Sequence, residues 1–373
     1  MRFTTTTTTL KAALSQISKV VKDRSTLPVL AGILLEAHVD GGLTLSGTDL
    51  ETRATKTIPA TIESDGAVVL PSKMLNSFVG ELGGGEVTIA VAANRRATIT
   101  SNRDQIVLAG LDPEEFPVAG EFDGAETTLT LSADLFAEGI TAVAHAVAPD
   151  ESRPVLAGVN LAVSDGVLTL AAADGNTLAI HHIRDMPDAP DLNLIVQGKP
   201  LAGLVGALAS ATSVRLAVNS NASRLLLDTE VGTWELRLIE GQFPDFMRII
   251  PRDVPDVFTA HRASLLAAVK LVAPVALENQ GITRMNLVGG ALTVHAKSAN
   301  ETAETSVDVE VSKGGTISWN LNNRLFRNAL ESFECTNVTL EVAGPASPMV
   351  VHSGDRANGC RVVMPMHVAK PKS

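Results

Sequence analysis

The chain has 373 residues, 45% of them hydrophobic and 19% charged, which is enough for two or three domains with buried cores. Its formal net charge of −11, taken as an average, argues against nucleic acid, whose phosphates are bound by Lys and Arg. The two cysteines, Cys335 and Cys360, exclude a disulfide framework and a four-cysteine zinc site, and we expect both to be buried free thiols.

Helical spacing of apolar residues predicts six helices, over residues 8–22, 71–81, 132–146, 199–210, 261–273 and 322–333. In the first, Leu10, Leu14 and Ile17 share one face. The run Thr4 to Thr9 is expected to divide between a strand, which suits β-branched residues, and a helix cap. No apolar stretch is long enough for a membrane span and no leader-like segment opens the chain, so we expect a cytoplasmic protein.

Short β-branched runs lie between the helices, and Gly, Asn and Asp separate them at hairpin distances, as in Asp40-Gly41-Gly42 and Asp165-Gly166. Most of these strands follow one another directly, which favours antiparallel sheets covered by helices, an α+β fold, over a doubly wound one. The same order of elements recurs three times, and the first two copies end in Phe-Pro, at Phe116-Pro117 and Phe243-Pro244. We therefore expect three similar domains with two helices each, over residues 1–123, 124–252 and 253–373.

Positive charge gathers on the predicted helices, whereas most carboxylates lie on strands and loops. The third helix, with Asp134 and Glu138, is the exception. A solvated helix face explains one such helix, but recurrence at equivalent helices favours a basic surface on an acidic protein. The residues concerned are Lys11, Lys19, Arg24, Lys199, Arg262 and Lys270.

Motifs for catalysis are weak. Asp49 and Asp174 follow strands beside turns, where an Asp caps backbone N–H groups more often than it acts as a general base. The pair His181-His182 points to opposite faces of a strand and so holds no metal in common. Gly198-Lys199-Pro200 lacks the upstream glycine of a phosphate-binding loop. We expect no catalytic site, metal or cofactor, although an enzyme acting on a small substrate near Asp174 is a second hypothesis.

Two apolar segments near the ends of the last two repeats indicate either a peptide-binding groove or plain linkers. One is Met364-Pro365-Met366, where proline suits a strand edge and methionine suits adaptable recognition. The other runs from Gly241 to Pro251.

Six stretches together make the chain resemble the bacterial DNA polymerase III beta subunit family, the replicative sliding clamps, over nearly its whole length. They are Arg24 to Leu30, Leu45 to Glu51, Phe116-Pro117, Ala173-Asp174-Gly175, Gly241 to Asp245 and Val362 to Met366. The resemblance implies a non-catalytic protein that forms a head-to-tail homodimeric ring around double-stranded DNA, with sheets outside and helices inside. The DNA-facing residues it implies are Arg24, Lys199 and, in a similar setting, Arg252. Lys11, Lys19, Arg262 and Lys270 are added from the charges on the helices.

The resemblance also implies a pocket in which the DNA polymerase III alpha subunit, the clamp loader and other proteins with a clamp-binding motif insert a short peptide. Its residues here are Leu156, Gly175, Asn176, Thr177, Leu178, Pro244, Arg248, Ile249, Val362, Met364, Pro365 and Met366. Asn176 and Thr177 stand where the family often has His-Arg, and His367 where it often has Arg. These departures concern the polar rim of the pocket, and they leave open a clamp paralogue with altered partner specificity.

Ring closure, in the family, joins the first domain of one copy to the third of the other. The resemblance implies that Ile106 and Leu108, flanked by Lys73, Arg96 and Arg103, meet Leu271 or Val272 together with Glu301 and Glu304.

Overall fold

The structure of the 373-residue chain is a computed structural model, and it describes residues 1–22, 25–119, 127–150, 152–186, 189–219, 221–366. The chain forms two compact units, Met1–Ala137 with Gly203–Leu238, and Glu138–Ala202 with Ile239–Ser373. The middle repeat therefore contributes to both units. Every described ladder between named strands is antiparallel, as predicted for an α+β fold.

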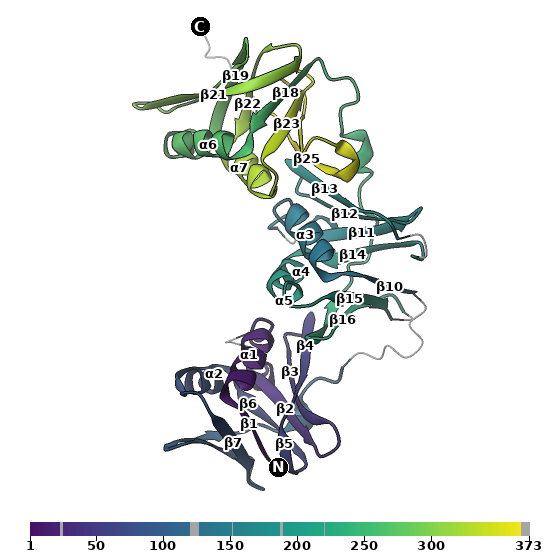
Figure 1. The fold of residues 1–373 in the computed structure, drawn as a ribbon, viewed down its shortest axis with the longest axis vertical. Coiled ribbons are helices and arrows are strands. Elements are labelled where there is room, and N and C mark those ends of the chain that lie inside the picture. Colours follow the sequence, from purple (N-terminus) through teal and green to yellow (C-terminus); the bar gives the residue numbers. More distant parts are fainter. Residues whose placement is uncertain (23–24, 120–126, 151, 187–188, 220, 367–373) are drawn as a thin grey trace. The chain divides into compact units, whose positions relative to one another are not determined.

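The first unit contains a five-stranded and an eight-stranded sheet (Figure 1). The smaller sheet has the order β5-β1-β7-β8-β9, with bounds Thr61–Ser64, Arg2–Thr6, Glu86–Val91, Arg96–Ser101 and Asp104–Ala109. The larger has the order β10-β15-β16-β17-β4-β3-β2-β6, with bounds Thr127–Ser132, Ser213–Val218, Arg224–Thr229, Gly232–Arg237, Thr52–Ile58, Gly42–Thr48, Gly32–His38 and Gly66–Pro71. Its helices include α1 (Thr7–Ile17), α2 (Ser72–Glu81) and α5 (Val205–Leu208). Short 3₁₀ turns are η1 (Pro28–Ala31) and η2 (Pro113–Glu115).

The second unit is built on one twelve-stranded arrangement, β14-β11-β12-β13-β25-β24-β23-β18-β21-β20-β19-β22. In that order the bounds are Leu192–Gln197, Gly158–Ser164, Val167–Ala173, Thr177–Ile183, Gly359–Val363, Met349–His352, Asn337–Val342, Asp256–His261, Thr302–Lys313, Ala291–Lys297, Ile282–Val288 and Thr316–Asn322. Helices α6 (Arg262–Leu277) and α7 (Asn323–Glu331) pack on its C-terminal part around Phe258, Trp319 and Phe326. The 3₁₀ turns are η3 (Pro154–Ala157), η4 (Phe246–Arg248) and η5 (Arg356–Asn358).

Five of the six predicted helices are confirmed with small shifts at their ends, and α3 (Ala133–Ala144) is the third of them. The prediction of one helix over 199–210 is wrong, because α4 (Gly198–Gly203) ends before Leu204 and α5 begins after it. Gly203 and Gly206 flank this break, and glycine weakens a helix interior. Helix α6 continues past Pro274, where the pattern had placed its end.

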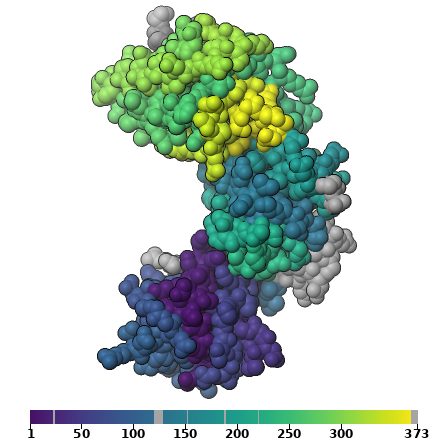
Figure 2. All heavy atoms as spheres, in the orientation of Figure 1, coloured from purple at the N-terminus to yellow at the C-terminus, as the bar shows by residue number. Residues whose placement is uncertain are grey.

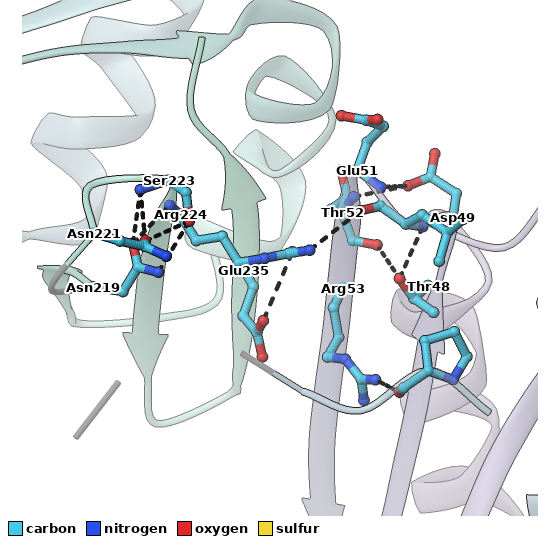
Figure 3. Close-up of polar contacts among 12 residues, drawn as sticks. Thr48, Asp49, Glu51, Thr52, Arg53, Asn219, Asn221, Ser223, Arg224 and Glu235 are labelled. Carbon is cyan, nitrogen blue, oxygen red and sulfur yellow. Dashed lines mark hydrogen bonds and ion pairs between the residues drawn. The ribbon is translucent and has the colours of Figure 1, made fainter. Parts of the chain in front are cut away.

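The first two repeats are joined in the first unit by pairing of β4 with β17, which sets Arg53 opposite Glu235 (Figure 3). Both side chains are buried, each 7% exposed. The Arg53 guanidinium lies 5.4 Å from the centroid of the Phe116 ring and donates to the Pro117 carbonyl. Burial lowers the pKa of Arg53, and the Glu235 carboxylate opposes that shift. This junction therefore holds two buried residues of opposite charge beside an aromatic ring.

Two further arginines of the first unit, Arg224 (Figure 3) and Arg237, connect the β16–β17 hairpin to the turn before β4. Arg224 lies 3.9 Å from the Glu235 carboxylate and donates to the Leu50 carbonyl at 3.5 Å. Arg237 pairs with Glu51 at 3.1 Å. Charged groups thus line this junction from its buried centre to its exposed edge.

The cysteine prediction is partly wrong. Both thiols are free, but only Cys360 is buried, and Cys335 is half-buried. Burial raises the pKa of Cys360 to about 11 and also raises the pKa of Cys335. Because the thiolate is the reactive form, neither is an activated nucleophile. Over the parts of the chain that the structure describes, no helix is long and apolar enough to cross a membrane.

The threonine run divides as predicted: β1 ends at Thr6, and the Thr6 hydroxyl accepts the Thr9 N–H at the start of α1. We expect Thr6→Ala to lower the stability of α1 by about 1 kcal/mol, since the cap is lost. Hydrogen exchange of the α1 amides measures this locally. The exposed Thr8→Ala is the matched control, and equal effects of the two substitutions would rule the cap out.

Candidate functional site

Strands β13 and β25 join the middle and C-terminal repeats in the second unit (Figure 1). Leu178 lies opposite Val362, and Ile180 lies opposite Cys360. Side chains alternate along a strand, so these four project on the same face. They are buried in one apolar cluster with Ala171, Ala173 and Val350. The junction between these repeats is thus apolar at its centre.

Partly buried apolar residues surround this cluster. Leu156 of η3 packs against it, as do Phe243, Phe246 and Ile250 from the segment that follows the middle repeat. The two phenylalanine rings meet edge to face, with centroids 6.1 Å apart. The predicted pocket set contains Leu156 but omits both rings, although their spacing around η4 in Phe243-Pro244-Asp245-Phe246 was a signal that could have found them.

The chain beyond β25 forms one edge of the junction. The Met364 N–H donates to the Asn176 carbonyl at 2.9 Å, and the Met364 side chain is 38% exposed. Pro365 bridges to Leu321, and the Met366 N–H donates to the Asn320 carbonyl at 2.8 Å. In the space-filling view yellow residues near the C-terminal end of the described chain reach the molecular surface (Figure 2). His367 lies outside the described residues.

The other predicted pocket residues lie on the exposed segment around η4. Pro244, Arg248 and Ile249 are all exposed. Arg248 pairs with Asp245 at 2.7 Å, but both side chains are largely in solvent, so the pair contributes little stability. Exposed Met247 and Ile249 add apolar surface next to the cluster.

Asp174 is a turn residue, as expected from the sequence. One carboxylate oxygen, Oδ1, accepts the N–H groups of Asn176 and Thr177 and the Thr177 hydroxyl. Gly175 has a φ of 90°, which favours glycine. Of the departures from the family pattern that the structure describes, Thr177 is buried and Asn176 is exposed.

The two adjacent histidines lie on β13 and do not form a metal site. The His182 Nδ1 lies 2.9 Å from the Thr169 hydroxyl. Burial, more than the charge of Arg361, lowers the pKa of His181 to about 4. Within the described ranges, no group of three or more His, Cys, Asp or Glu side chains is placed to hold a metal ion.

The predicted DNA-facing cations divide into exposed and engaged groups. Lys19, Lys199, Arg252 and Lys270 are exposed. Of these, Lys270 pairs with Glu331 at 2.8 Å, and the Lys199 ammonium donates to the Pro149 carbonyl at 3.5 Å. The Lys11 ammonium instead donates to the Leu82 carbonyl at 2.7 Å, and the Arg262 Nε donates to the Cys335 carbonyl at 2.8 Å. Arg24 lies outside the described residues.

Some of the residues predicted for ring closure lie at two open sheet edges, one in each unit, whereas Lys73 lies on α2 and Leu271 and Val272 lie on α6. Strand β9, with Ile106 and Leu108, ends the five-stranded sheet. In β21, residues 302–308 pair only with β20 among the described ladders. Leu108 is buried whereas Val107 is 43% exposed; Val272 is fully buried whereas Leu271 is 58% exposed. Lys73, Arg96 and Arg103 in the first unit and Glu301 and Glu304 in the second are exposed.

These sites offer apolar surface, strand edges and exposed cations, which suit binding more than bond breaking. Comparison with known proteins agrees. The DNA polymerase III beta subunit family matches residues 1–120 by its N-terminal domain, 130–245 by its central domain and 247–367 by its C-terminal domain. The fold is that of a DNA polymerase sliding clamp. The solved clamp of Bacillus subtilis superposes with a TM-score of 0.92 at 22% identity, covering 99% of this chain and 100% of the other.

The DNA polymerase III subunit beta of Pseudomonas aeruginosa superposes with a TM-score of 0.90 at 26% identity, over 99% of this chain and 100% of that one. The beta sliding clamp of Staphylococcus epidermidis is 25% identical over 363 residues, 95% of this chain and 96% of its own length. The chain belongs to the DNA polymerase III beta subunit family, with three similar domains in succession.

The buried histidines make the second unit sensitive to acid. Burial lowers the pKa of His145 to about 3 and of His181 to about 4, whereas an unfolded histidine titrates near 6.5. The unfolded chain therefore binds more protons below pH 6.5, and the free energy of unfolding falls as pH drops from there towards 4. We expect His181→Gln to reduce this slope by up to about 1.4 kcal/mol per pH unit between about pH 6 and about pH 5.

Urea unfolding at several pH values measures the slope. His38→Gln, at an exposed position of the first unit, is the matched control. A slope that does not respond to His181→Gln would contradict the assignment.

Proposed function

We propose that this chain is a DNA sliding clamp: two copies close head to tail into a ring around duplex DNA and tether the replicative polymerase for processive synthesis. The match of three successive beta subunit domains along one chain carries the proposal. As a member of this family, the chain is a processivity subunit and has no catalytic site of its own. We assign its domains to residues 1–123, 124–252 and 253–373, and its working place to the cytoplasm.

Two open edges support ring closure. An unpaired strand edge exposes N–H and C=O groups that pair readily with another chain. Strand β9 of one copy and residues 302–308 of β21 in a second copy supply complementary edges. Exposed Leu271 adds apolar area. The cations Lys73, Arg96 and Arg103 oppose Glu301 and Glu304 in charge, which favours heterologous contact over pairing of like surfaces.

Exposed cations support DNA binding without base reading. Lys19, Lys199, Arg252 and Lys270 offer charge to phosphates, and Arg24 completes the proposed set. Lys11 and Arg262 are weaker members, because both are half-buried and each donates to a backbone carbonyl, at 2.7 Å and 2.8 Å respectively. Phosphate contacts carry no sequence information, which is what a ring that slides requires.

The apolar junction of β13 and β25 supports a peptide groove for the DNA polymerase III alpha subunit, the clamp loader and other proteins with a clamp-binding motif. Buried Leu178 and Val362 form its floor, and exposed Met364 and Ile249 offer contacts at its rim. A few apolar anchors in such a groove supply most of the binding energy. The comparisons do not favour the alternative, a paralogue with different partners.

A ring that is held by topology stays on DNA without ends. We expect the loaded clamp to co-elute with nicked circular DNA in gel filtration and to be lost when the circle is cut, since it slides off a free end. The dimer should also appear in the solution molar mass. Equal retention on short linear duplexes would contradict threading.

The proposed groove predicts that a charge at Met364 weakens peptide binding. We expect Met364→Asp to weaken binding of a labelled peptide with a Leu-Phe pair at least about tenfold, because a carboxylate is placed against apolar anchors. Met74→Asp is the matched control, since Met74 is exposed on α2 of the other unit. Fluorescence anisotropy measures both, and equal affinities for the two variants would place the peptide elsewhere.

A further inference from the structure

Strand β25 has two faces with different chemistry. Cys360 and Val362 project into the apolar cluster of the junction, whereas Arg361 and Val363 project from the opposite face. Arg361 is 3% exposed, although arginine is rarely buried without partners. A buried cation thus lies directly behind the strand that carries the groove.

The Arg361 guanidinium links three elements. Its Nη1 donates to the Ile180 carbonyl of β13 at 2.9 Å. Its Nε donates to the Ser332 hydroxyl at 2.8 Å, where Ser332 caps the C-terminal end of α7. The guanidinium also lies 4.4 Å from the centroid of the Phe333 ring. One side chain therefore connects the middle repeat, the last strand and helix α7.

The surroundings hold this cation in place. The C-terminal end of a helix carries partial negative charge, which favours a cation there. Glu138 of α3 adds a favourable charge, whereas His145 and His181 face Arg361 and are kept neutral. Cys335 and Cys360 also lie near it. Separating the buried Arg361 guanidinium from these partners costs free energy, because the charge would be left without compensation. Strand β25 is therefore held in position.

We propose that Arg361 is a positioning residue for the peptide groove: from the hidden face of β25 it fixes that strand against β13 and α7, and so holds Val362 and Met364 where a peptide's apolar anchors pack. The inference rests on the proposed function, because it presumes that the groove binds peptide. The planar fork of arginine matters here, since lysine cannot donate in the same directions and stack on Phe333 together.

The test compares Arg361→Met and Arg361→Lys with Arg324→Met, a control at an exposed arginine of α7. The probes are a fluorescein-labelled synthetic peptide with a Leu-Phe pair and the same peptide with both residues changed to alanine. We expect both Arg361 variants to bind the first peptide about threefold to thirtyfold more weakly, the range typical of residues that act on a site indirectly. The alanine peptide should show no comparable loss, because its anchors are already absent.

Hydrogen exchange provides the second measurement. Amides of 359–363 should exchange faster in the Arg361 variants, while those of β19 and β20 in the same repeat stay protected. Ser332→Ala removes the acceptor of the Arg361 Nε, together with the bond that the Ser332 hydroxyl donates to the Ala329 carbonyl, and it leaves Arg361 in place. This variant still tests the inference if Arg361→Met does not fold. Suppose that Arg361→Lys and Ser332→Ala are folded and dimeric, and that their affinities for the Leu-Phe peptide stay within about twofold of the unmodified chain. That result would overturn the inference about Arg361 and leave the proposed groove intact. Failure of the unmodified chain to bind the Leu-Phe peptide would instead count against the groove itself.

Discussion

Main-chain pairing across repeats is the constraint on which the rest of the structure depends. β4 pairs with β17 in the first unit, and β13 pairs with β25 in the second. Each ladder satisfies the N–H and C=O groups of what would otherwise be an open edge. Neighbouring repeats are thus fixed by hydrogen bonds that do not depend on side-chain identity. The side chains on either face of each ladder can therefore differ between the two junctions. The proposed peptide groove depends on such a difference.

Local structure was predictable from the sequence because its causes are local. Thr6 caps α1 by its own hydroxyl, and Asp174 holds its turn through N–H groups two and three residues on. Pairing between repeats was not predictable in the same way. A period of two shows which residues of a strand share a face, but not which distant strand lies alongside. The broken helix around Leu204 was missed because its apolar pattern continues through two glycines.

The residues of the candidate groove were likewise predictable in part from the sequence. Leu178 and Val362 were identified by resemblance and lie in one cluster. Phe243 and Phe246 were omitted, although they pack on that cluster. No pattern indicated Arg361, because a charged residue in a strand is ordinarily expected to face solvent. Its burial results from acceptors that come together only in three dimensions, the Ile180 carbonyl and Ser332.

The two junctions differ in chemistry, which fits the proposal of one peptide groove and not two. Asp49 caps its turn as Asp174 does, so Arg53 and Leu178 occupy equivalent positions. Across the ladders Arg53 lies opposite Glu235 (Figure 3), and Leu178 lies opposite Val362. In the first junction these positions hold buried charged groups, with the Arg53 guanidinium against the Phe116 ring, and charged groups offer no apolar surface to a ligand. In the second, aliphatic side chains at the same positions make a floor on which apolar anchors gain by burial.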